Sequence, residues 1–419
     1  MTRAAKKRLI FSAVMLFAAA VLLEGACFAL LTILDAKSGM GLYKALMLRR
    51  AELAWAWGDR VYCSVFDPIT QVRHKPGTSY YGLRVNENGY IENGNPDPAL
   101  SAWPEKPAGT VRVALLGGSS TAGYGVSDNS DTIAAILERR LNLAYGGPER
   151  RFQVLNLGFA GGYSAMEAAL FMNQVIYLVP DAVIFLDGYN DVFNALFEHQ
   201  RNRLPHPLLN WFDYSYATFA AMNGYPERPW PRLKVLTWFS VSIARLSQAI
   251  LPRDVTELYE GYPHYRLSGR IAALHPYLEN VALNNLEAVA SYCAVNKIPA
   301  IFCLQPQPLS GGKKLTAEEK AGIKDWFDRF SALSPFIDTK KMISETNAAF
   351  GALEKQYEIS GKKFAPWPHV RFVSLTGLFA SETETVYVDS LHTNERGNAL
   401  FAERYFTDLT DVLNLSARP

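Results

Sequence analysis

Three residues of this sequence, Ser119, Asp389 and His392, have the types and the order of a serine-hydrolase triad. A serine hydroxyl is a poor nucleophile until a base takes its proton, and His392 can be that base. Asp389, three residues earlier, can reach the other ring nitrogen of His392, hold its tautomer and stabilise the imidazolium. These residues predict acyl transfer through a covalent acyl-enzyme.

Acyl transfer also needs hydrogen-bond donors for the oxyanion of its tetrahedral intermediate. We expect these donors to be the backbone N–H groups of Ser119 and Gly161 and the side-chain amide of Asn190. Glycine suits position 161 because its backbone can come close to a ligand. The three residues together predict an oxyanion hole.

Short apolar runs alternate with helical patterns in the part of the chain that carries these residues. The runs are residues 111–116, 152–157, 182–186, 300–304 and 370–375. The helical patterns lie near residues 133–141, 164–178, 281–295, 316–332, 338–357 and 394–414. This alternation is typical of an α/β fold with a parallel sheet and helices on both faces.

The predicted topology places the candidate residues at one edge of that sheet. Ser119, Gly161 and Asn190 follow the first, second and third runs, and the pair Asp389 and His392 follows the fifth. Ligands bind outside the carboxyl ends of the strands in open parallel sheets. We therefore expect these side chains to meet at that edge.

These blocks resemble the SGNH hydrolase superfamily, also called the GDSL esterase/lipase group, which is named after a Ser, a Gly, an Asn and a His in four separated blocks. The matching residues are Ser119, Gly161, Asn190 and His392 with Asp389. The resemblance implies a three-layer α/β/α sandwich with a five-stranded, flavodoxin-like parallel sheet. It also implies ester hydrolysis or acyl transfer without a metal or cofactor.

Details of the first block bear on the nucleophile. The family pattern selects Ser119 rather than Ser120, because the serine stands two residues before Thr121 and four before Gly123. Gly118 departs from the pattern, since the family's commonest form has Asp there in a supporting role.

Phosphate binding is the competing interpretation of the same glycine loop. Residues 118–123 have P-loop spacing, but Tyr124 occupies the position of the required Lys, and a G-x-G-x-x-G fingerprint is missing. The histidines show no pairing at metal-ligand spacing. We therefore expect neither a cofactor nor a metal.

The N-terminus predicts a membrane anchor. Four Lys or Arg residues within the first eight precede an apolar run from Leu9 to Leu34, and this run exceeds the ~20 residues that span a bilayer. We predict a single uncleaved transmembrane helix with a cytoplasmic N-terminus and the main body on the extracytoplasmic (periplasmic or extracellular) side. A cleaved signal peptide and a lipoprotein beginning at Cys27 are the less favoured alternatives.

We divide the chain into three parts. Residues 1–38 form the cytoplasmic tip and the anchor, residues 39–109 a juxtamembrane helix and an N-terminal appendage of turns and short strands, and residues 110–419 the hydrolase domain. An insertion at about residues 192–275, rich in aromatics and prolines, interrupts this domain. A lid or substrate wall is one interpretation of the insertion, and a structural excursion that buries its own aromatics is the other.

Composition excludes two classes of protein. A formal charge of +2 without a basic stripe beyond the N-terminus disfavours a nucleic-acid partner. The four cysteines form no C-x-x-C pair, which disfavours a zinc ribbon or a thioredoxin-type site. We expect Cys293 and Cys303 to be buried thiols, with a disulfide between them as the less favoured alternative.

Three functions fit these patterns. The first is an esterase that hydrolyses acyl esters, such as O-acetyl groups, of a small molecule or of an envelope or exported polysaccharide. The second is an O-acyltransferase to a glycan, which would use the same triad and a membrane acyl-donor protein. The third is a catalytically silent, membrane-anchored glycan-binding or assembly protein, which the complete triad disfavours.

Overall fold

The computed structural model describes residues 11–29 (except 13 and 28), 64–94 (except 68 and 69), 105–196, 282–333 and 339–416. The chain forms two compact units, Met1–Val61 with Tyr216–Tyr262 and Tyr62–Ser215 with Pro263–Pro419. The predicted juxtamembrane helix and most of the predicted insertion lie outside the described residues.

A five-stranded parallel sheet forms the centre of this unit. Its strands are β5 (Thr110–Gly117), β6 (Arg151–Asn156), β7 (Ala182–Asp187), β8 (Ala300–Leu304) and β9 (Val370–Ser374). The order β6-β5-β7-β8-β9 is that of the flavodoxin-like doubly wound sheet. Every residue of β7 and β8 is buried, as expected for strands covered on both faces.

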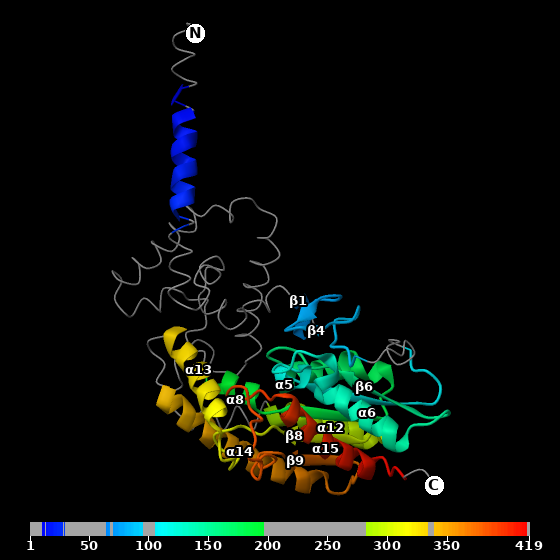
Figure 1. Cartoon of the computed structure of the whole chain (residues 1–419). Helices are drawn as coiled ribbons and strands as arrows, with labels where there is room; N and C mark the ends of the chain where they lie inside the picture. Colours follow the sequence, from blue (N-terminus) through cyan, green and yellow to red (C-terminus); the bar gives the residue numbers. More distant parts are fainter. Residues whose placement is uncertain are drawn as a thin grey trace. The chain divides into compact units, whose positions relative to one another are not determined.

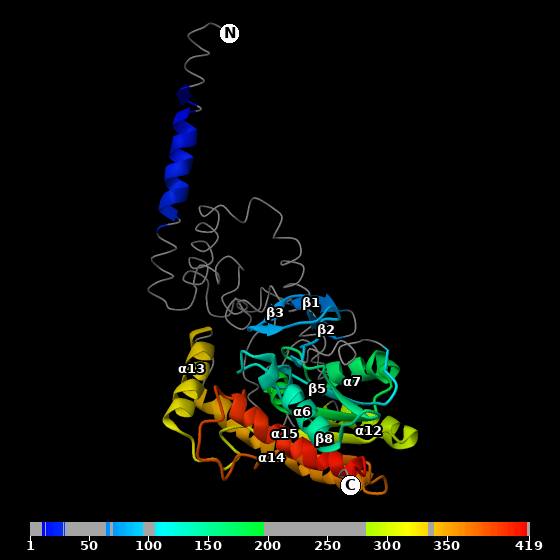
Figure 2. The same ribbon diagram turned by 45° about the vertical axis from the view of Figure 1, so that its right-hand side comes forward.

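Helices cover both faces of the sheet, and their bounds follow the predicted patterns closely. Helices α6 (Ile133–Tyr145) and α15 (Glu395–Val412) pack against each other on one face, and α7 (Ser164–Asn173), α12 (Asn284–Asn296) and α14 (Thr339–Phe364) cover the other (Figures 1 and 2). The α/β class and the parallel five-stranded sheet flanked by helices are thus confirmed.

One predicted helix is shorter than expected. The pattern over 164–178 predicts a continuous helix, but α7 ends at Asn173 and a 3₁₀ helix spans Val175–Leu178. Gln174 leaves the helical region, and Val179 adopts a φ of 51° before Pro180, which disfavours α-helical backbone at the residue preceding it.

Short antiparallel strands precede the sheet, in agreement with the turn-rich composition there. β1 (Ser64–Asp67) pairs with β2 (Gln71–His74), and β3 (Ser79–Tyr80) pairs with β4 (Leu83–Arg84). This segment belongs to the same compact unit as the sheet. Ile91 forms an antiparallel bridge to Asn156 of β6, and the Asn93 amide donates a hydrogen bond to the Val154 carbonyl at 2.6 Å.

Residues 11–12 and 14–27 are helical (Figure 1). Among the described residues, no helix has the length and apolar character needed to cross a membrane. The run from Leu9 to Leu34 extends beyond the described residues at both ends, so the anchor stays a prediction.

Cys293 of α12 and Cys303 of β8 are both buried and free. The disulfide alternative is therefore wrong. Burial raises the pKa of the Cys293 thiol to about 12 and raises that of Cys303 as well, so both behave as small apolar side chains.

We expect His74 to contribute less to the stability of the fold in mild acid. This side chain is buried against the Gly158 backbone, and burial lowers its pKa from 6.5 to about 4. As the pH falls between these two values, His74 is protonated in the unfolded chain but not in the folded chain. The contribution of His74 to the free energy of unfolding should therefore drop by roughly 3 kcal/mol in that window. Urea unfolding at a series of pH values should show a flatter profile for His74→Gln, and an equally steep profile would contradict the assignment.

Candidate active site

The structure brings Ser119, His392 and Asp389 together. Ser119 begins the short helix α5 (Ser119–Ala122) directly after β5, and the other two lie in the loop between β9 and α15. Ser119 Oγ is 2.7 Å from His392 Nε2, and His392 Nδ1 is 2.7 Å from Asp389 Oδ2. An ionised carboxylate only accepts hydrogen bonds, so Nδ1 carries a proton and Nε2 is left to accept the serine hydroxyl.

The environment of Asp389 keeps it ionised. Burial alone would raise the pKa of this carboxyl, but the neighbouring His392 and two backbone N–H groups outweigh burial and hold the pKa below its usual value. Those N–H groups, of Leu391 and His392, donate to Oδ1 at 2.9 and 2.8 Å. Oδ2 therefore remains available for the imidazole.

Asn190 and the glycine loop after β6 lie beside the nucleophile. Asn190 stands in the first turn of α8 (Tyr189–Leu196), and its amide donates to the Gly162 carbonyl at 2.7 Å. Gly161 adopts a φ of 74°, which favours glycine. Because an amide carries two hydrogens, one remains for a ligand. A Cβ atom at Gly118, the residue before Ser119, would lie within 3.0 Å of both Asn190 Nδ2 and the Gly162 carbonyl oxygen, so Asn190 and Gly162 lie beside the nucleophile turn. The role of Asn190, Gly161 and Ser119 as oxyanion donors stays a prediction.

The same contacts leave little room for a side chain at Gly118. A Cβ atom at this position would lie 2.5 Å from Asn190 Nδ2 and 3.0 Å from the Gly162 carbonyl oxygen. An Asp would therefore displace the amide that stands beside Ser119. The absence of a side chain at 118 lets Asn190 approach the nucleophile turn.

Buried acids that sequence analysis missed lie next to the glycine loop and to the start of α8. Asp191 accepts hydrogen bonds from the hydroxyl and the backbone N–H of Ser164 at 2.6 and 3.3 Å, which joins the starts of α8 and α7. Glu167 and Asp187 are both buried, and their pKa values lie well above the usual range. Burial is the main cause for each, followed by the charge of Asp187 for Glu167 and the charge of Asp191 for Asp187. A Cβ atom at Gly162 would lie 3.2 Å from Glu167 Oε1, so Glu167 lies against the glycine loop.

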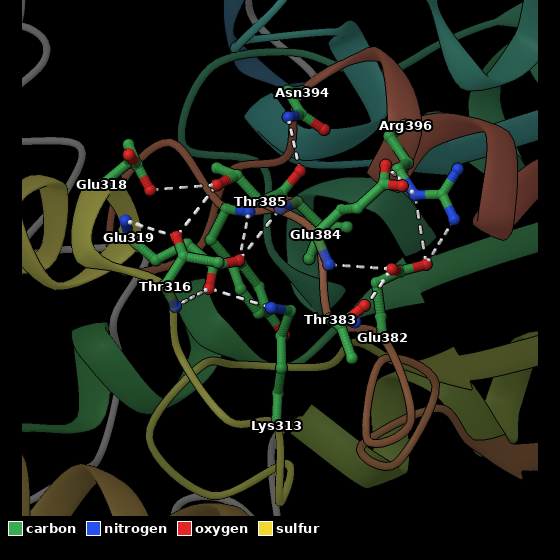
Figure 3. Close-up of polar contacts among 12 residues, drawn as sticks. Lys313, Thr316, Glu318, Glu319, Glu382, Thr383, Glu384, Thr385, Asn394 and Arg396 are labelled. Carbon is green, nitrogen blue, oxygen red and sulfur yellow. Dashed lines mark hydrogen bonds and ion pairs between the residues drawn. The ribbon is translucent and has the colours of Figure 1, made fainter.

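A buried glutamate holds the loop that carries Asp389 and His392 (Figure 3). Glu319, which is 0% exposed, accepts hydrogen bonds through Oε1 from the backbone N–H groups of Val386 at 2.9 Å and Tyr387 at 3.1 Å. Its Oε2 accepts from Lys313 Nζ at 2.9 Å and from the Thr316 N–H at 2.8 Å. Burial would raise the pKa of Glu319, but these four donors together hold it below its usual value.

Part of this arrangement has a sequence signal. Thr316 and Glu319 form a capping box at the start of α13 (Ala317–Leu333), because the Glu319 N–H also donates to Thr316 Oγ1 at 3.2 Å. The pattern Thr-x-x-Glu could therefore have predicted the helix start. It could not have predicted that the second carboxylate oxygen reaches backbone 67 residues away.

The far end of the loop is held by the start of α15 (Figure 3). Asn394 caps this helix by accepting the Gly397 N–H at 3.0 Å, and its amide donates to the Thr385 carbonyl at 2.8 Å. Arg396 donates to Glu382 through two nitrogens, at 2.8 and 3.1 Å. The residues that carry the acid and the imidazole are thus tied at both ends.

Comparison with known proteins finds likeness only among solved structures. No protein-family model matches the chain, and no curated protein matches it. An α/β hydrolase from the metagenome of Lake Arreo, Spain, is 14% identical with a TM-score of 0.36, over 73% of this chain and 97% of that one. An acetylxylan esterase from Geobacillus stearothermophilus is 12% identical with a TM-score of 0.34, over 72% and 95%. A protein described as lipolytic and of the G-D-S-L family, from Desulfitobacterium hafniense DCB-2, is 9% identical with a TM-score of 0.36, over 71% of this chain and 99% of that one. At such low identities and TM-scores, the functional assignment has to rest on this chain's own residues.

We expect Glu319→Gln to loosen the triad loop. The variant leaves the buried Lys313 without its counter-charge and turns an amide NH₂ toward backbone donors, so it should lower the free energy of unfolding by roughly 3–5 kcal/mol. Hydrogen exchange at the N–H groups of Val386 and Tyr387 should accelerate. The matched control is Glu318→Gln, an exposed neighbour whose loss should stay within about 0.5 kcal/mol. Equal effects of the two variants would contradict the anchoring role of Glu319.

Proposed function

We propose that this chain is a serine esterase that hydrolyses acyl esters, with Ser119 as nucleophile, His392 as general base and acid, and Asp389 as the orienting carboxylate. The observation that carries the proposal is the continuous hydrogen-bonded series from Ser119 Oγ through both imidazole nitrogens to Asp389 Oδ2, with both links at 2.7 Å. If Ser119, His392 and Asp389 had only a structural role, each side chain could form its hydrogen bonds with nearby groups. The continuous series would then not be needed.

The reaction follows from this geometry. Ser119 Oγ attacks the ester carbonyl carbon while its proton passes to His392 Nε2, and the carbonyl oxygen becomes an oxyanion. The amide of Asn190 and the N–H groups of Ser119 and Gly161 stabilise that oxyanion, and each such donor lowers the barrier by about 3 kcal/mol. Collapse breaks the bond to the alcohol, which leaves with the proton from Nε2. Water then attacks the acyl-enzyme, with His392 again taking a proton, and releases the acid.

The proposed setting is the outer side of a membrane. The predicted N-terminal anchor supports an extracytoplasmic site, where O-acyl groups of envelope or exported polysaccharide are available, and acetyl is the simplest such group. Transfer of the acyl group to a glycan hydroxyl, from a membrane acyl-donor protein, would use the same intermediate with a sugar in place of water.

Ser119→Ala should abolish ester hydrolysis. We expect kcat for p-nitrophenyl acetate, butyrate and octanoate to fall by at least about a thousandfold, because the acyl-enzyme cannot form. Ser120→Ala is the matched control, since Ser120 is equally buried at 6% exposure and adjacent in α5, yet should keep its activity. A fluorophosphonate should label the wild type and Ser120→Ala, but not Ser119→Ala. Failure of the wild type to hydrolyse any ester or to be labelled would refute the proposal.

Transfer and hydrolysis can be separated with the trapped acyl-enzyme. Addition of a glycan acceptor should release only free acid if the chain is an esterase. Acylated glycan as the product would show that the chain is an acyltransferase rather than an esterase.

A further inference from the structure

Three successive side chains in the first turn of α8 contact three different segments of the site. The Tyr189 hydroxyl lies 3.1 Å from Ser390 Oγ, in the loop that carries the acid and the imidazole of the triad. The Asn190 amide donates to the glycine loop after β6, and Asp191 accepts a hydroxyl hydrogen at the start of α7. Successive residues of an α-helix point about 100° apart, so a single helical turn can hold all three segments.

The Tyr189 hydroxyl has partners on both sides of the imidazole. Tyr189 is 5% exposed, and Ser390, the residue directly after Asp389, is 2% exposed. Trp326 of α13 forms a second hydrogen bond with the same hydroxyl, and the Trp326 ring lies 5.9 Å from the His392 ring between centroids. One buried hydroxyl therefore bonds to the residue after the acid and to an aromatic neighbour of the imidazole.

Apolar packing accounts for the ring of Tyr189 but not for its hydroxyl. The ring lies 6.3 Å from that of Phe350 between centroids, and the preceding Gly188 turns the chain after β7 with a φ of 130°. A Cβ atom at Gly188 would lie 2.6 Å from Leu304 Cδ1, so this turn is closely packed. A phenylalanine would fill the same space, and a hydroxyl at this depth costs free energy unless it is hydrogen-bonded.

The esterase reaction proposed above needs two groups to stay aligned that come from different elements. Ser119 Oγ attacks the carbonyl carbon with His392 as base, while the carbonyl oxygen moves toward the Asn190 amide. Asn190 lies on α8 after β7, whereas His392 lies in the loop that follows the edge strand β9. A bond between α8 and this loop keeps the two groups in register while the proton moves on and off the imidazole.

We propose that Tyr189 is a positioning residue that aligns the His392 imidazole with the oxyanion amide of Asn190. It acts through its hydroxyl, which is bonded to Ser390 and Trp326, and this role rests on the esterase function proposed above. A phenol can accept a hydrogen bond from the indole N–H and donate its own hydrogen to a serine hydroxyl. Burial is the main reason why the pKa of Tyr189 is raised to about 12, so the hydroxyl keeps its hydrogen wherever a histidine normally titrates.

Removal of this hydroxyl alone tests the role in the full-length chain. Tyr189→Phe keeps the ring but should lower kcat for p-nitrophenyl acetate by about tenfold, because formation and hydrolysis of the acyl-enzyme both use His392 as base. KM should stay within about twofold, since both steps slow together. The rate of fluorophosphonate labelling of Ser119 should fall by a similar factor. A kcat within about twofold of the wild type would overturn the proposal.

Tyr145→Phe is the matched control. Tyr145 is 8% exposed, and its hydroxyl lies 3.2 Å from Thr410 Oγ1, so this variant also removes a bond between a buried phenol and a hydroxyl on another element. Its ring lies near Phe152 at the amino end of β6, away from the edge of the sheet that carries the triad. The variant should change kcat and the labelling rate by less than about twofold. Losses as large as those of Tyr189→Phe would mean that any buried phenol has this effect, which contradicts positioning by Tyr189.

A double variant shows whether Tyr189 acts through Ser390. Ser390→Ala alone should lower kcat, and the double variant with Tyr189→Phe should be no slower than Tyr189→Phe alone, within about twofold, because the same bond is already lost. Losses that multiply would mean that the two hydroxyls act independently, which would overturn the link between α8 and the triad loop.

Nuclear magnetic resonance of the imidazole separates this role from the esterase function. The Nδ1 proton of His392, held by Asp389, should give a resolved signal in the wild type and in Tyr145→Phe, and exchange with water should broaden it in Tyr189→Phe. This readout needs no ester. A wild type that neither hydrolyses esters nor is labelled by fluorophosphonate would refute the esterase function, whereas an imidazole signal unchanged in Tyr189→Phe would refute the positioning role.

Discussion

The contact between Ser119 and His392 imposes the main constraint on this structure, because the two residues follow strands that are not neighbours in the sheet. Ser119 follows β5, whereas His392 follows β9, the edge strand beyond β7 and β8. At the usual strand spacing these strands are ~14 Å apart. The loop after β9 must therefore return toward the middle of the sheet to place Nε2 at 2.7 Å from Oγ. Much of the unit's polar structure serves to hold this returning loop.

A charged side chain suits that task for a physical reason. The backbone N–H groups of Val386 and Tyr387 are buried in an irregular loop, and unpaired buried donors are costly. One carboxylate, on Glu319, satisfies both and also the first turn of α13. A buried ion pair with Lys313 adds little to stability compared with apolar packing, but it defines a single position for the loop. Trp326 is seven residues further along α13, on the same helical face, so one helix positions both the loop and a ring beside its imidazole.

Sequence patterns predicted those features that depend on local periodicity or on the rule for parallel sheets. Near-continuous apolar runs located all five strands, and their carboxyl ends located the residues around Ser119. Features that depend on contacts between distant segments could not be predicted. The closeness of Gly118 to Asn190 and the burial of Glu167 are two such features. Tyr81 has a φ of 51°, a backbone conformation that is uncommon for a bulky residue, so residue preferences could not have predicted it.

The segment before the sheet packs on the segment after the nucleophile. Residues 64–94 belong to the same compact unit as the sheet, and a Cβ atom at Gly82 would lie 3.3 Å from the Ser127 carbonyl oxygen. That segment also meets the triad loop, since a Cβ at Gly125 would lie 2.3 Å from the Thr393 carbonyl oxygen. Residues 119–127 are therefore in contact with the early turn and with the late loop. The position of the segment that begins at Ser119 therefore depends on packing against residues that precede the sheet as well as on the strands of the sheet.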